Sequence, residues 1–448
     1  MPMRTLSRSF PSPRVNLTSC FRPAILIAAA AAMSLATAAH AQWMVTNLNP
    51  AGATTTSEAF ATTGTQQAGI ARILTAGVPQ AGIWGGTAAS FINLNPAGAS
   101  SSEAFATTGT QQAGIATIGG VIRAGIWSGT AASWVSLHPA GATESYAFGT
   151  TGAQQAGYGI FGGQWRAGIW RGTAESWSNL NPAGSTASAI SATTGTQQAG
   201  IAQINGVYQA GIWSGTPGSF VSLHPAGASY SIARATTGTQ QAGFADIGVV
   251  QSAGIWTGTA ASWVNLNPAE STGSDVFATN GTHQVGYASF PSVQSAVIWS
   301  GTAGSLEVLP MPQTGSWPIS TAYGIWSDAT TLYIAGFGFN VSINRGVALL
   351  WTRPIPTGAC CTGTTCAVLA QAACTGTFPG PGTACDFPSN PVTCCKANFN
   401  QFSGLTVQDV FDFLAAWFSN AATADFNGTN GVTLQDLFDF LEAWFAGC

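Results

Sequence analysis

Carboxylate side chains, which can supply acid and base catalysis, are scarce before Pro356 in this 448-residue chain. A glycosidase needs two of them close together, one to protonate the leaving group and one to act as base or nucleophile. No two stand at a motif spacing, although two from distant segments could converge in the fold. The nine are Glu58, Glu103, Glu144, Glu175, Asp246, Glu270, Asp275, Glu307 and Asp328. Hydrolase or lyase chemistry is therefore left open, without a motif to support it.

Histidine and glutamine side chains recur at matching places, which favours structural roles. His138 and His224 each precede a proline, where other copies of the motif have asparagine, and a residue that exchanges with asparagine at a turn is interpreted as a turn residue. Paired glutamines begin at residues 66, 111, 154, 197 and 240, and His283 takes the first place of a further pair. They could offer amides to a sugar, but we expect them to hydrogen-bond within the fold. No Ser-His-Asp signature, zinc motif or phosphate loop occurs.

Cysteines are concentrated in residues 357–395, after the linker-like Pro354-Ile355-Pro356. This segment is too short to build its own core, so disulfides are the expected substitute. Zinc is the alternative, but the segment contains no histidine. It resembles short Cys-rich modules of secreted bacterial proteins, and the sequence does not determine the pairing. The cysteines are Cys360, Cys361, Cys366, Cys374, Cys385, Cys394 and Cys395.

Two copies of a loop and helix end the chain, in residues 396–448. The segment 405–414 returns at a step of 27 as 432–441, each with apolar residues at helical spacing. The pair resembles a dockerin, a module of two EF-hand-like units that binds cohesin domains. The final Gly447-Cys448 resembles the dockerin variant of bacterial surface proteins that end in Gly-Cys. The resemblance implies a cohesin-like or cell-envelope partner, and Cys448 either joins a surface attachment or pairs with a cysteine of the preceding module.

The same resemblance implies one calcium site, in the second loop. Calcium takes oxygen ligands from alternating positions of a 12-residue loop. In the second loop, Thr429 stands where an acid is usual and Asn430 where glycine is usual. In the first loop, Asn398 and Phe402 replace acids, so we expect the calcium site of the first loop to be weak or absent. A metal-free helical pair held by its aromatic core is the alternative. The expected ligands are Asp425, Asn427, Thr429, the carbonyl of Gly431, Thr433 and Asp436.

The rest of the mature chain, residues 42–356, consists of repeated units. These units must position the carboxylate, histidine and glutamine side chains of any functional site. Each unit contains four short runs of β-forming residues separated by turn residues, which in the second unit are 102–107, 112–118, 123–127 and 133–137. One unit has too few large apolar residues to be stable alone, so the units must pack on one another. An Ile-Trp pair ends at Trp84, Trp127, Trp170, Trp213, Trp256 and Trp299, at steps of 43 residues.

The first and last runs of the array distinguish a ring from an open stack. The array begins with a run, Trp43 to Leu48, that lacks a preceding Ile-Trp partner, and it ends with Leu350-Trp351, which lacks a following partner. We therefore predict that the first run completes the last sheet of a seven-bladed β-propeller. An open β-solenoid is the alternative. Residues 112–115 (Gln-Ala-Gly-Ile) and 124–127 (Ala-Gly-Ile-Trp) resemble the HAF family of extracellular repeats, which implies this architecture and no particular activity.

Composition and the N-terminus favour a secreted β-rich protein. Only 6% of residues are charged and the net charge is -4, so nucleic-acid binding is not indicated. Four arginines precede an uncharged run, Ala24 to Ala39, and Ala39-His40-Ala41 then offers a signal-peptidase site, so we expect a signal peptide over residues 1–41. This run is shorter than the roughly 20 residues that cross a bilayer, so no membrane span is expected in the mature chain.

These features together predict a mainly β, secreted or cell-surface binding or structural protein. Its propeller would present a glycan-binding or protein-binding face, and the dockerin-like tail would tether it with the help of calcium. The alternative is a carbohydrate-active enzyme, a polysaccharide hydrolase or lyase, on the same tether. Two carboxylates in one pocket would favour the enzyme, whereas an aromatic-lined face without them would favour binding.

Overall fold

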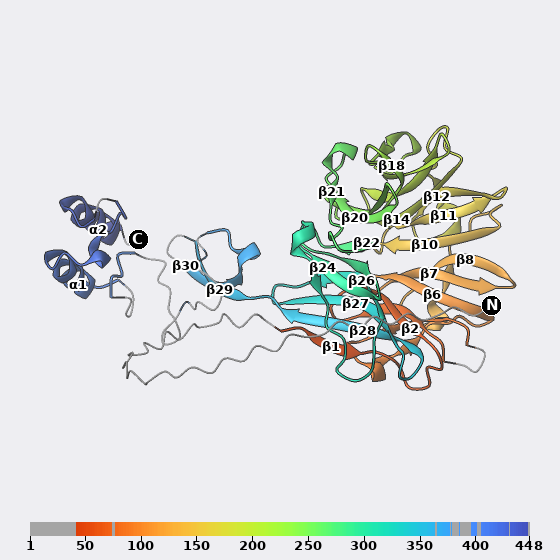
Figure 1. Cartoon of the computed structure of the whole chain (residues 1–448), viewed down its shortest axis with the longest axis horizontal. Coiled ribbons are helices and arrows are strands. Elements are labelled where there is room, and N and C mark those ends of the chain that lie inside the picture. Colours follow the sequence, from red (N-terminus) through yellow and green to blue (C-terminus); the bar gives the residue numbers. More distant parts are fainter. Residues whose placement is uncertain are drawn as a thin grey trace, which may run out of the picture. The chain divides into compact units, whose positions relative to one another are not determined.

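The protein is mainly β, and the described part of the chain contains two short α-helices near its C-terminal end (Figure 1). The computed structural model describes residues 42–73, 77–362, 365–376, 378, 385, 396–400, 405–429 and 431–446. The expected signal peptide, residues 1–41, lies outside the described residues, as do Phe402, Cys394, Cys395, Asn430 and Cys448.

Five of the repeats each form one four-stranded antiparallel sheet, with the strands in chain order. Group 1 is β2 (Ser57–Thr62), β3 (Gln67–Ala71), β4 (Gln80–Trp84) and β5 (Ile92–Asn93), and group 2 is β6 (Ala99–Thr107), β7 (Gln112–Ile118), β8 (Val121–Trp127) and β9 (Val135–Ser136). Group 3 is β10 (Glu144–Thr150), β11 (Gln155–Phe161), β12 (Gln164–Trp170) and β13 (Ser178–Asn179), and group 4 is β14 (Ala187–Thr193), β15 (Gln198–Ile204), β16 (Val207–Trp213) and β17 (Val221–Ser222). Group 5 is β18 (Ala228–Thr236), β19 (Gln241–Ile247), β20 (Val250–Trp256) and β21 (Val264–Asn265).

The fourth strand of each group is shorter than the sequence pattern predicts. In group 2 the expected run 133–137 becomes a 3-10 helix, η2 (Ala131–Ser133), followed by the two-residue strand β9. The hydroxyl of Ser133 accepts a hydrogen bond from the backbone N–H of Ser128 at 2.8 Å and donates to the carbonyl of Thr130 at 2.6 Å. These bonds hold Ser133 in the turn, so it cannot extend the strand. Equivalent 3-10 helices are η1 (Ala88–Ser90), η3 (Ala174–Ser176), η4 (Pro217–Ser219), η5 (Ala260–Ser262) and η6 (Ala303–Ser305).

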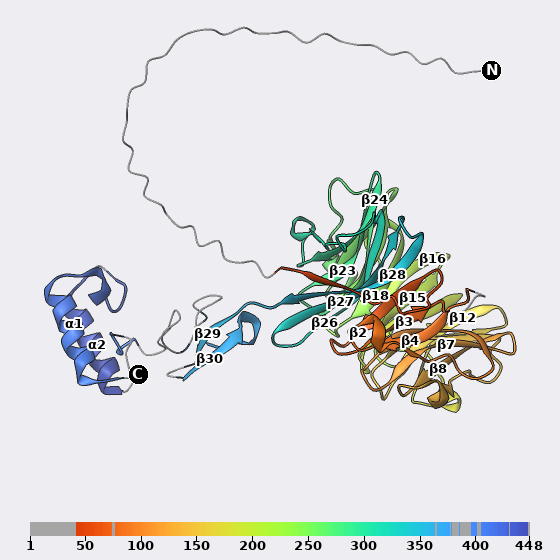
Figure 2. The ribbon, with the colours of Figure 1, turned by 90° about the horizontal axis from the view of Figure 1, so that it is seen from below.

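The remaining strands of the array form one eight-stranded sheet. Group 6 is β22 (Gly273–Thr279), β23 (Gln284–Phe290), β24 (Val293–Trp299) and β25 (Glu307–Val308), and group 7 is β26 (Ile319–Ser327), β27 (Thr331–Asn340), β28 (Arg345–Pro354) and β1 (Met44–Asn47). A single pair, Gln294 opposite Ile319, joins the two groups. β1 runs antiparallel to β28 with Val45 opposite Trp351, which confirms the predicted pairing of the first and last runs (Figure 2).

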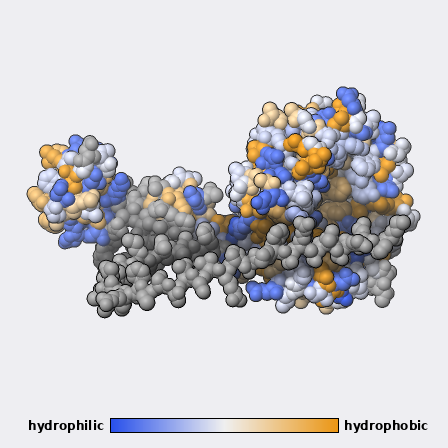
Figure 3. Space-filling view, viewed as in Figure 1, coloured by the Kyte–Doolittle hydropathy of each residue, from blue (hydrophilic) through white to orange (hydrophobic). Residues whose placement is uncertain are grey.

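The core of the array lies between the groups rather than within them. Trp127 of group 2 is fully buried against Ile83 and Leu94 of group 1, and Trp170 of group 3 packs in the same way against Ile126 and Leu137 of group 2. This arrangement explains why one unit alone would lack a core. On the face seen in Figure 3, apolar residues lie among polar residues and residues of intermediate hydropathy.

Each group contacts the next one along the chain, and the last group contacts the first. The first strands of successive groups contact one another from β2 through β6, β10, β14, β18 and β22 to β26, and β26 contacts β2. Leu48 and Leu350 of group 7 share a buried cluster with Trp84 and Ala59 of group 1. Group 7, which is built from both ends of the array, therefore packs against group 1 as the other groups pack against their neighbours.

The segment after the array contains a hairpin, β29 (Thr357–Thr362) and β30 (Thr365–Ala370), followed by the 3-10 helix η7 (Gln371–Ala373). Disulfides join Cys360 to Cys374 and Cys366 to Cys385. The prediction of disulfides in this segment is confirmed for these four cysteines.

The tail contains α1 (Val407–Phe418), the 3-10 helix η8 (Ala422–Ala424) and α2 (Leu434–Ala446), and its two halves interact reciprocally. The rings of Phe413 and Phe440 stack at 4.0 Å between centroids. The indole N–H of Trp417 donates to the carbonyl of Thr433 at 2.8 Å, and that of Trp444 donates to the carbonyl of Thr406 at 3.0 Å. Among the described residues, neither of these helices nor any other has the length and hydropathy to cross a membrane.

Candidate binding cavity

A β-bulge in the first strand of each group supplies one inward-pointing residue. In group 2, Ala104 pairs with Gly114 and Ala106 pairs with Ala113, so Phe105 between them has no partner across the ladder. A Cβ atom on Gly114 would lie 1.9 Å from the carbonyl oxygen of Glu103. The glycine of the repeated Gln-Ala-Gly motif is therefore needed for the close approach of the bulged strand.

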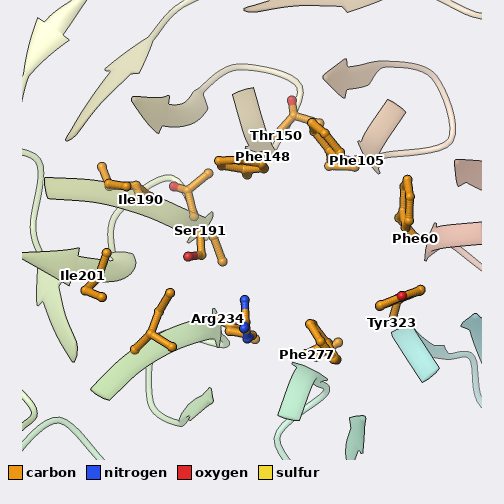
Figure 4. A pocket seen from close by; sticks show the side chains of 18 of the residues that line it. Phe60, Phe105, Phe148, Thr150, Ile190, Ser191, Ile201, Arg234, Phe277 and Tyr323 are labelled. Carbon is orange, nitrogen blue, oxygen red and sulfur yellow. The ribbon is translucent and has the colours of Figure 1, made fainter. Parts of the chain in front are cut away.

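The seven bulge residues come together around one cavity of about 700 Å³ (Figure 4). Each belongs to the first strand of a different group, and the same glycine contact recurs in all seven groups at 1.8 to 2.1 Å. The residues are Phe60, Phe105, Phe148, Ser191, Arg234, Phe277 and Tyr323. Five of them are aromatic, so most of the wall that these seven residues form is apolar.

The five aromatic residues form a continuous arc. Ring centroids are separated by 5.1 Å between Phe148 and Phe105, 5.8 Å between Phe105 and Phe60, 5.4 Å between Phe60 and Tyr323, and 5.1 Å between Tyr323 and Phe277. Such contacts hold the rings in fixed orientations. All five side chains are only partly buried, which leaves them able to contact a ligand in the cavity.

Arg234 continues the arc beyond Phe277, and Ser191 is the small residue between Arg234 and Phe148. The guanidinium carbon of Arg234 lies 4.7 Å from the ring centroid of Phe277. Its Nε donates to both carboxylate oxygens of Asp275, at 2.9 and 3.1 Å. Asp275 is 1% exposed, and burial raises the pKa of its carboxyl group above the ordinary value while the guanidinium opposes that shift. The ion pair fixes the position of Arg234 at the cavity wall.

No carboxylate is among the described residues that line this cavity. Glu58 and Glu103 stand two residues before the bulges on neighbouring strands, and Asp275 holds the same place in group 6. Burial raises the pKa of Glu58, and the charge of Glu103 raises it further. Burial also raises the pKa of Glu103. The two glutamates thus interact with each other, and neither is among the described residues that line the cavity.

The glutamine pairs join neighbouring groups. Oε1 of Gln66 in group 1 accepts hydrogen bonds from the hydroxyl of Thr107 at 2.5 Å and the side-chain amide of Gln112 at 2.8 Å, both in group 2. Four further pairs repeat this arrangement around the array. The prediction that these amides serve the fold is confirmed.

His138 and His224 also have structural contacts, whereas Nδ1 of His283 is buried without a hydrogen-bond partner among the described residues. Nδ1 of His138 lies 2.8 Å from the hydroxyl of Ser145, as Oδ1 of Asn95 lies 2.7 Å from the hydroxyl of Ser102 in the preceding group. His224 makes the same contact with Ser231 at 2.7 Å. These rings therefore replace the asparagine side chain in a turn, as predicted.

The tail residues expected to bind calcium lie around one loop. Oδ1 of Asp425 and Oδ1 of Asn427 both accept from the backbone N–H of Thr429 at 3.0 Å, so the two oxygens converge. Asp436 accepts from the N–H and the hydroxyl of Thr433 at 2.7 Å, and the N–H of Asn427 lowers the pKa of the Asp436 carboxyl. Gly431 adopts a positive φ of 75°. The chemistry of this donor set, oxygen atoms only, suits calcium.

The first loop lacks an acid at the place equivalent to Asp425, where Asn398 stands. Oδ1 of Asn398 is buried and has no hydrogen-bond partner among the residues that the structure describes. Over the described residues, no three His, Cys, Asp or Glu side chains gather into a metal-binding group.

The seven bulge residues were not predicted from the sequence. Their one signal in the sequence is a variable position two residues after Glu58, Glu103 and their equivalents, which holds Phe, Ser, Arg or Tyr and is followed by Ala or Gly in every group. The residue type at this position varies while the rest of the repeat is regular, so the fold does not require one particular residue at the cavity wall.

No protein-family model matches the chain, and no curated protein matches it. Among solved structures, it is similar to the β-propeller domain of the Trilobed protease from Pyrococcus furiosus, with 10% identity and a TM-score of 0.47 over 67% of this chain and 97% of that one. It is similar to TolB from Acinetobacter baumannii, with 9% identity and a TM-score of 0.35 over 55% of this chain and 63% of that one. A prolyl endopeptidase matches with 10% identity and a TM-score of 0.44 over 66% of this chain, and the match spans 50% of the peptidase.

Proposed function

We propose that the seven groups form a closed seven-bladed β-propeller whose central cavity binds a ligand with a large apolar surface. The observation that carries this proposal is the arc of five aromatic side chains around a cavity with no carboxylate among its described lining residues. Closure of the ring is supported by the pairing of β1 with β28 and the contact of β26 with β2. The aromatic wall favours binding over polysaccharide hydrolysis.

In this proposal the protein is a secreted or cell-surface binding protein rather than an enzyme. Two disulfides after the array suit an oxidising compartment. The dockerin-like tail would tether the propeller to a cohesin-like or cell-envelope partner, with the second loop holding calcium through Asp425, Asn427 and Asp436 and their neighbours.

The cavity is tested by titrating the full chain with N-phenyl-1-naphthylamine, a neutral aromatic probe that fluoresces in apolar sites. We expect saturable binding that Phe105→Ser weakens about tenfold, because the change removes one ring of the arc. The control is Val135→Ser, at a residue that is 45% exposed and lies outside the cavity. Equal binding by the parent, Phe105→Ser and Val135→Ser would contradict the proposal.

The alternative function, polysaccharide hydrolysis, is tested by measuring the release of reducing sugar from a polysaccharide. Activity that Glu58→Gln or Glu103→Gln abolishes would favour the enzyme instead.

The calcium site is tested by calorimetry of the full chain with and without calcium. At a calcium concentration of about 100 times Kd, binding should stabilise the tail by about 2.7 kcal/mol. Asp425→Ala should remove most of this increment because it deletes an acidic ligand. Gln435→Ala serves as the control, because Gln435 bonds to Asp439 and is not an expected ligand. A parent protein whose tail melts at the same temperature with and without calcium would refute the site.

A further inference from the structure

The aromatic arc of the cavity is interrupted at one corner by two polar residues, Ser191 and Arg234. They occupy equivalent bulges on β14 and β18, which are neighbouring strands. Arg234 is the cation among the described residues that line the cavity, and Figure 4 shows its nitrogen atoms directed toward the interior. The cavity thus has an apolar side and a corner that carries a guanidinium group and a hydroxyl.

The contacts of Arg234 hold it in place without using its outer nitrogen atoms. Its hydrogen bonds to Asp275 involve Nε alone. Within the described part of the chain, no acceptor is hydrogen-bonded to Nη1 or Nη2. The side chain is 31% exposed, whereas that of Asp275 is 2% exposed. The donors of Nη1 and Nη2 are therefore available to a group inside the cavity.

The other groups show that the fold does not need this ion pair. The places of Arg234 and Asp275 are taken by Ser191 and Ile232 between groups 4 and 5, and by Phe148 and Ala189 between groups 3 and 4. A buried ion pair is weak support for stability, because removing two charges from water offsets most of their attraction. A role in binding accounts for a charge at this one bulge.

We propose that the cavity binds an apolar or aromatic molecule that carries a carboxylate or sulfonate group. Its apolar body would lie against the arc from Phe148 to Phe277, and its anionic group would accept hydrogen bonds from Nη1 and Nη2 of Arg234 beside the hydroxyl of Ser191. Charge-assisted bonds of this kind are stronger than neutral ones, and a guanidinium fits a planar carboxylate. This inference rests on the proposed function of the cavity and specifies its ligand class.

The test compares two probes that differ only in an anionic group. They are 1-anilinonaphthalene-8-sulfonate and N-phenyl-1-naphthylamine, which lacks the sulfonate. Each is titrated into the full chain, into the double variant Arg234→Phe/Asp275→Ala, and into Phe105→Ser. The double variant copies Phe148 and Ala189, so it leaves no buried charge without a partner, and circular dichroism and thermal unfolding check that each variant is folded. If the double variant does not fold, Arg234→Gln/Asp275→Asn, which keeps the side-chain volumes, replaces it.

We expect the ratio of the sulfonate affinity to the neutral-probe affinity to fall at least about tenfold in the double variant, because the guanidinium is lost while the arc gains a ring. Phe105→Ser should weaken both probes by a similar factor. If the double variant changes both affinities equally, or neither, the role of Arg234 is refuted while the cavity stands. If neither probe responds to Phe105→Ser, the probes bind elsewhere, and both the cavity and this inference fail.

Discussion

Glu58 and Glu103 connect the stability of the array to pH. Burial raises the pKa of both carboxyl groups, and mutual repulsion adds to the shift at Glu58. A carboxyl whose pKa is raised on folding binds its proton more tightly in the folded protein than in the unfolded chain. Its contribution to stability is therefore fully present below the ordinary glutamate value of about 4.3 and is lost as the pH rises through the folded-state pKa.

We therefore expect Glu58→Gln to raise the melting temperature at pH 7 and to have little effect near pH 4. The amide keeps the shape of the side chain and removes the charge that burial opposes. Melting temperatures of parent and variant from pH 4 to pH 8 provide the measurement, with Glu175→Gln, at an exposed glutamate, as the control. A variant that is less stable than the parent at pH 7 would show that the ionised form of Glu58 is the one the fold needs.

In groups 1 to 5, an aromatic side chain that follows the third strand packs against a glycine of that strand. A Cβ on Gly125 would lie 2.1 Å from the Trp134 ring, and the same contact recurs at Gly82, Gly168, Gly211 and Gly254 with Phe or Trp. Group 6 has Val297 at the glycine position and Leu306 at the aromatic position, and these two residues share a packed cluster. The larger strand residue is accommodated there because the covering residue is smaller.

This exchange predicts strong coupling between the two positions in group 2. Gly125→Val should destabilise the protein by about 1 to 3 kcal/mol through overpacking against Trp134. Adding Trp134→Leu should recover much of that loss, giving an interaction free energy of about 1 to 3 kcal/mol in a double-mutant cycle followed by urea unfolding. Additive effects of the two substitutions would mean that the group 6 pair is not transferable.

The whole molecule depends on group 7 being assembled from both ends of the array. Leu48, beside β1, is fully buried, as are Leu137 and the other leucines at the same place in groups 1 to 6. If the ring is closed, Leu48→Ala should cost about 2 to 5 kcal/mol, similar to Leu137→Ala, because both leave a cavity between packed groups. Equilibrium unfolding in urea measures both losses. A much smaller cost for Leu48→Ala would indicate a frayed end and an open array.

Much of the array could be predicted from the sequence because its information is local and repeated. The step of 43 residues located the groups, the run 112–118 coincides with β7, and the unpaired runs near Trp43 and Trp351 predicted the pairing of β1 with β28. His138 could be assigned to a turn because Asn95 stands at the same place in another copy. Each of these inferences needed only comparison between copies.

The tertiary structure alone decided the cavity. Phe105 points inward because a bulge shifts the alternation of β6, and nothing in the alternating pattern of one strand announces that shift. The pair of Arg234 and Asp275 joins different strand groups, and the aromatic arc collects side chains from five first strands spread over residues 60–323. The sequence of one strand shows which residues share a face of that strand. The packing of the seven groups determines which of those residues meet around the cavity.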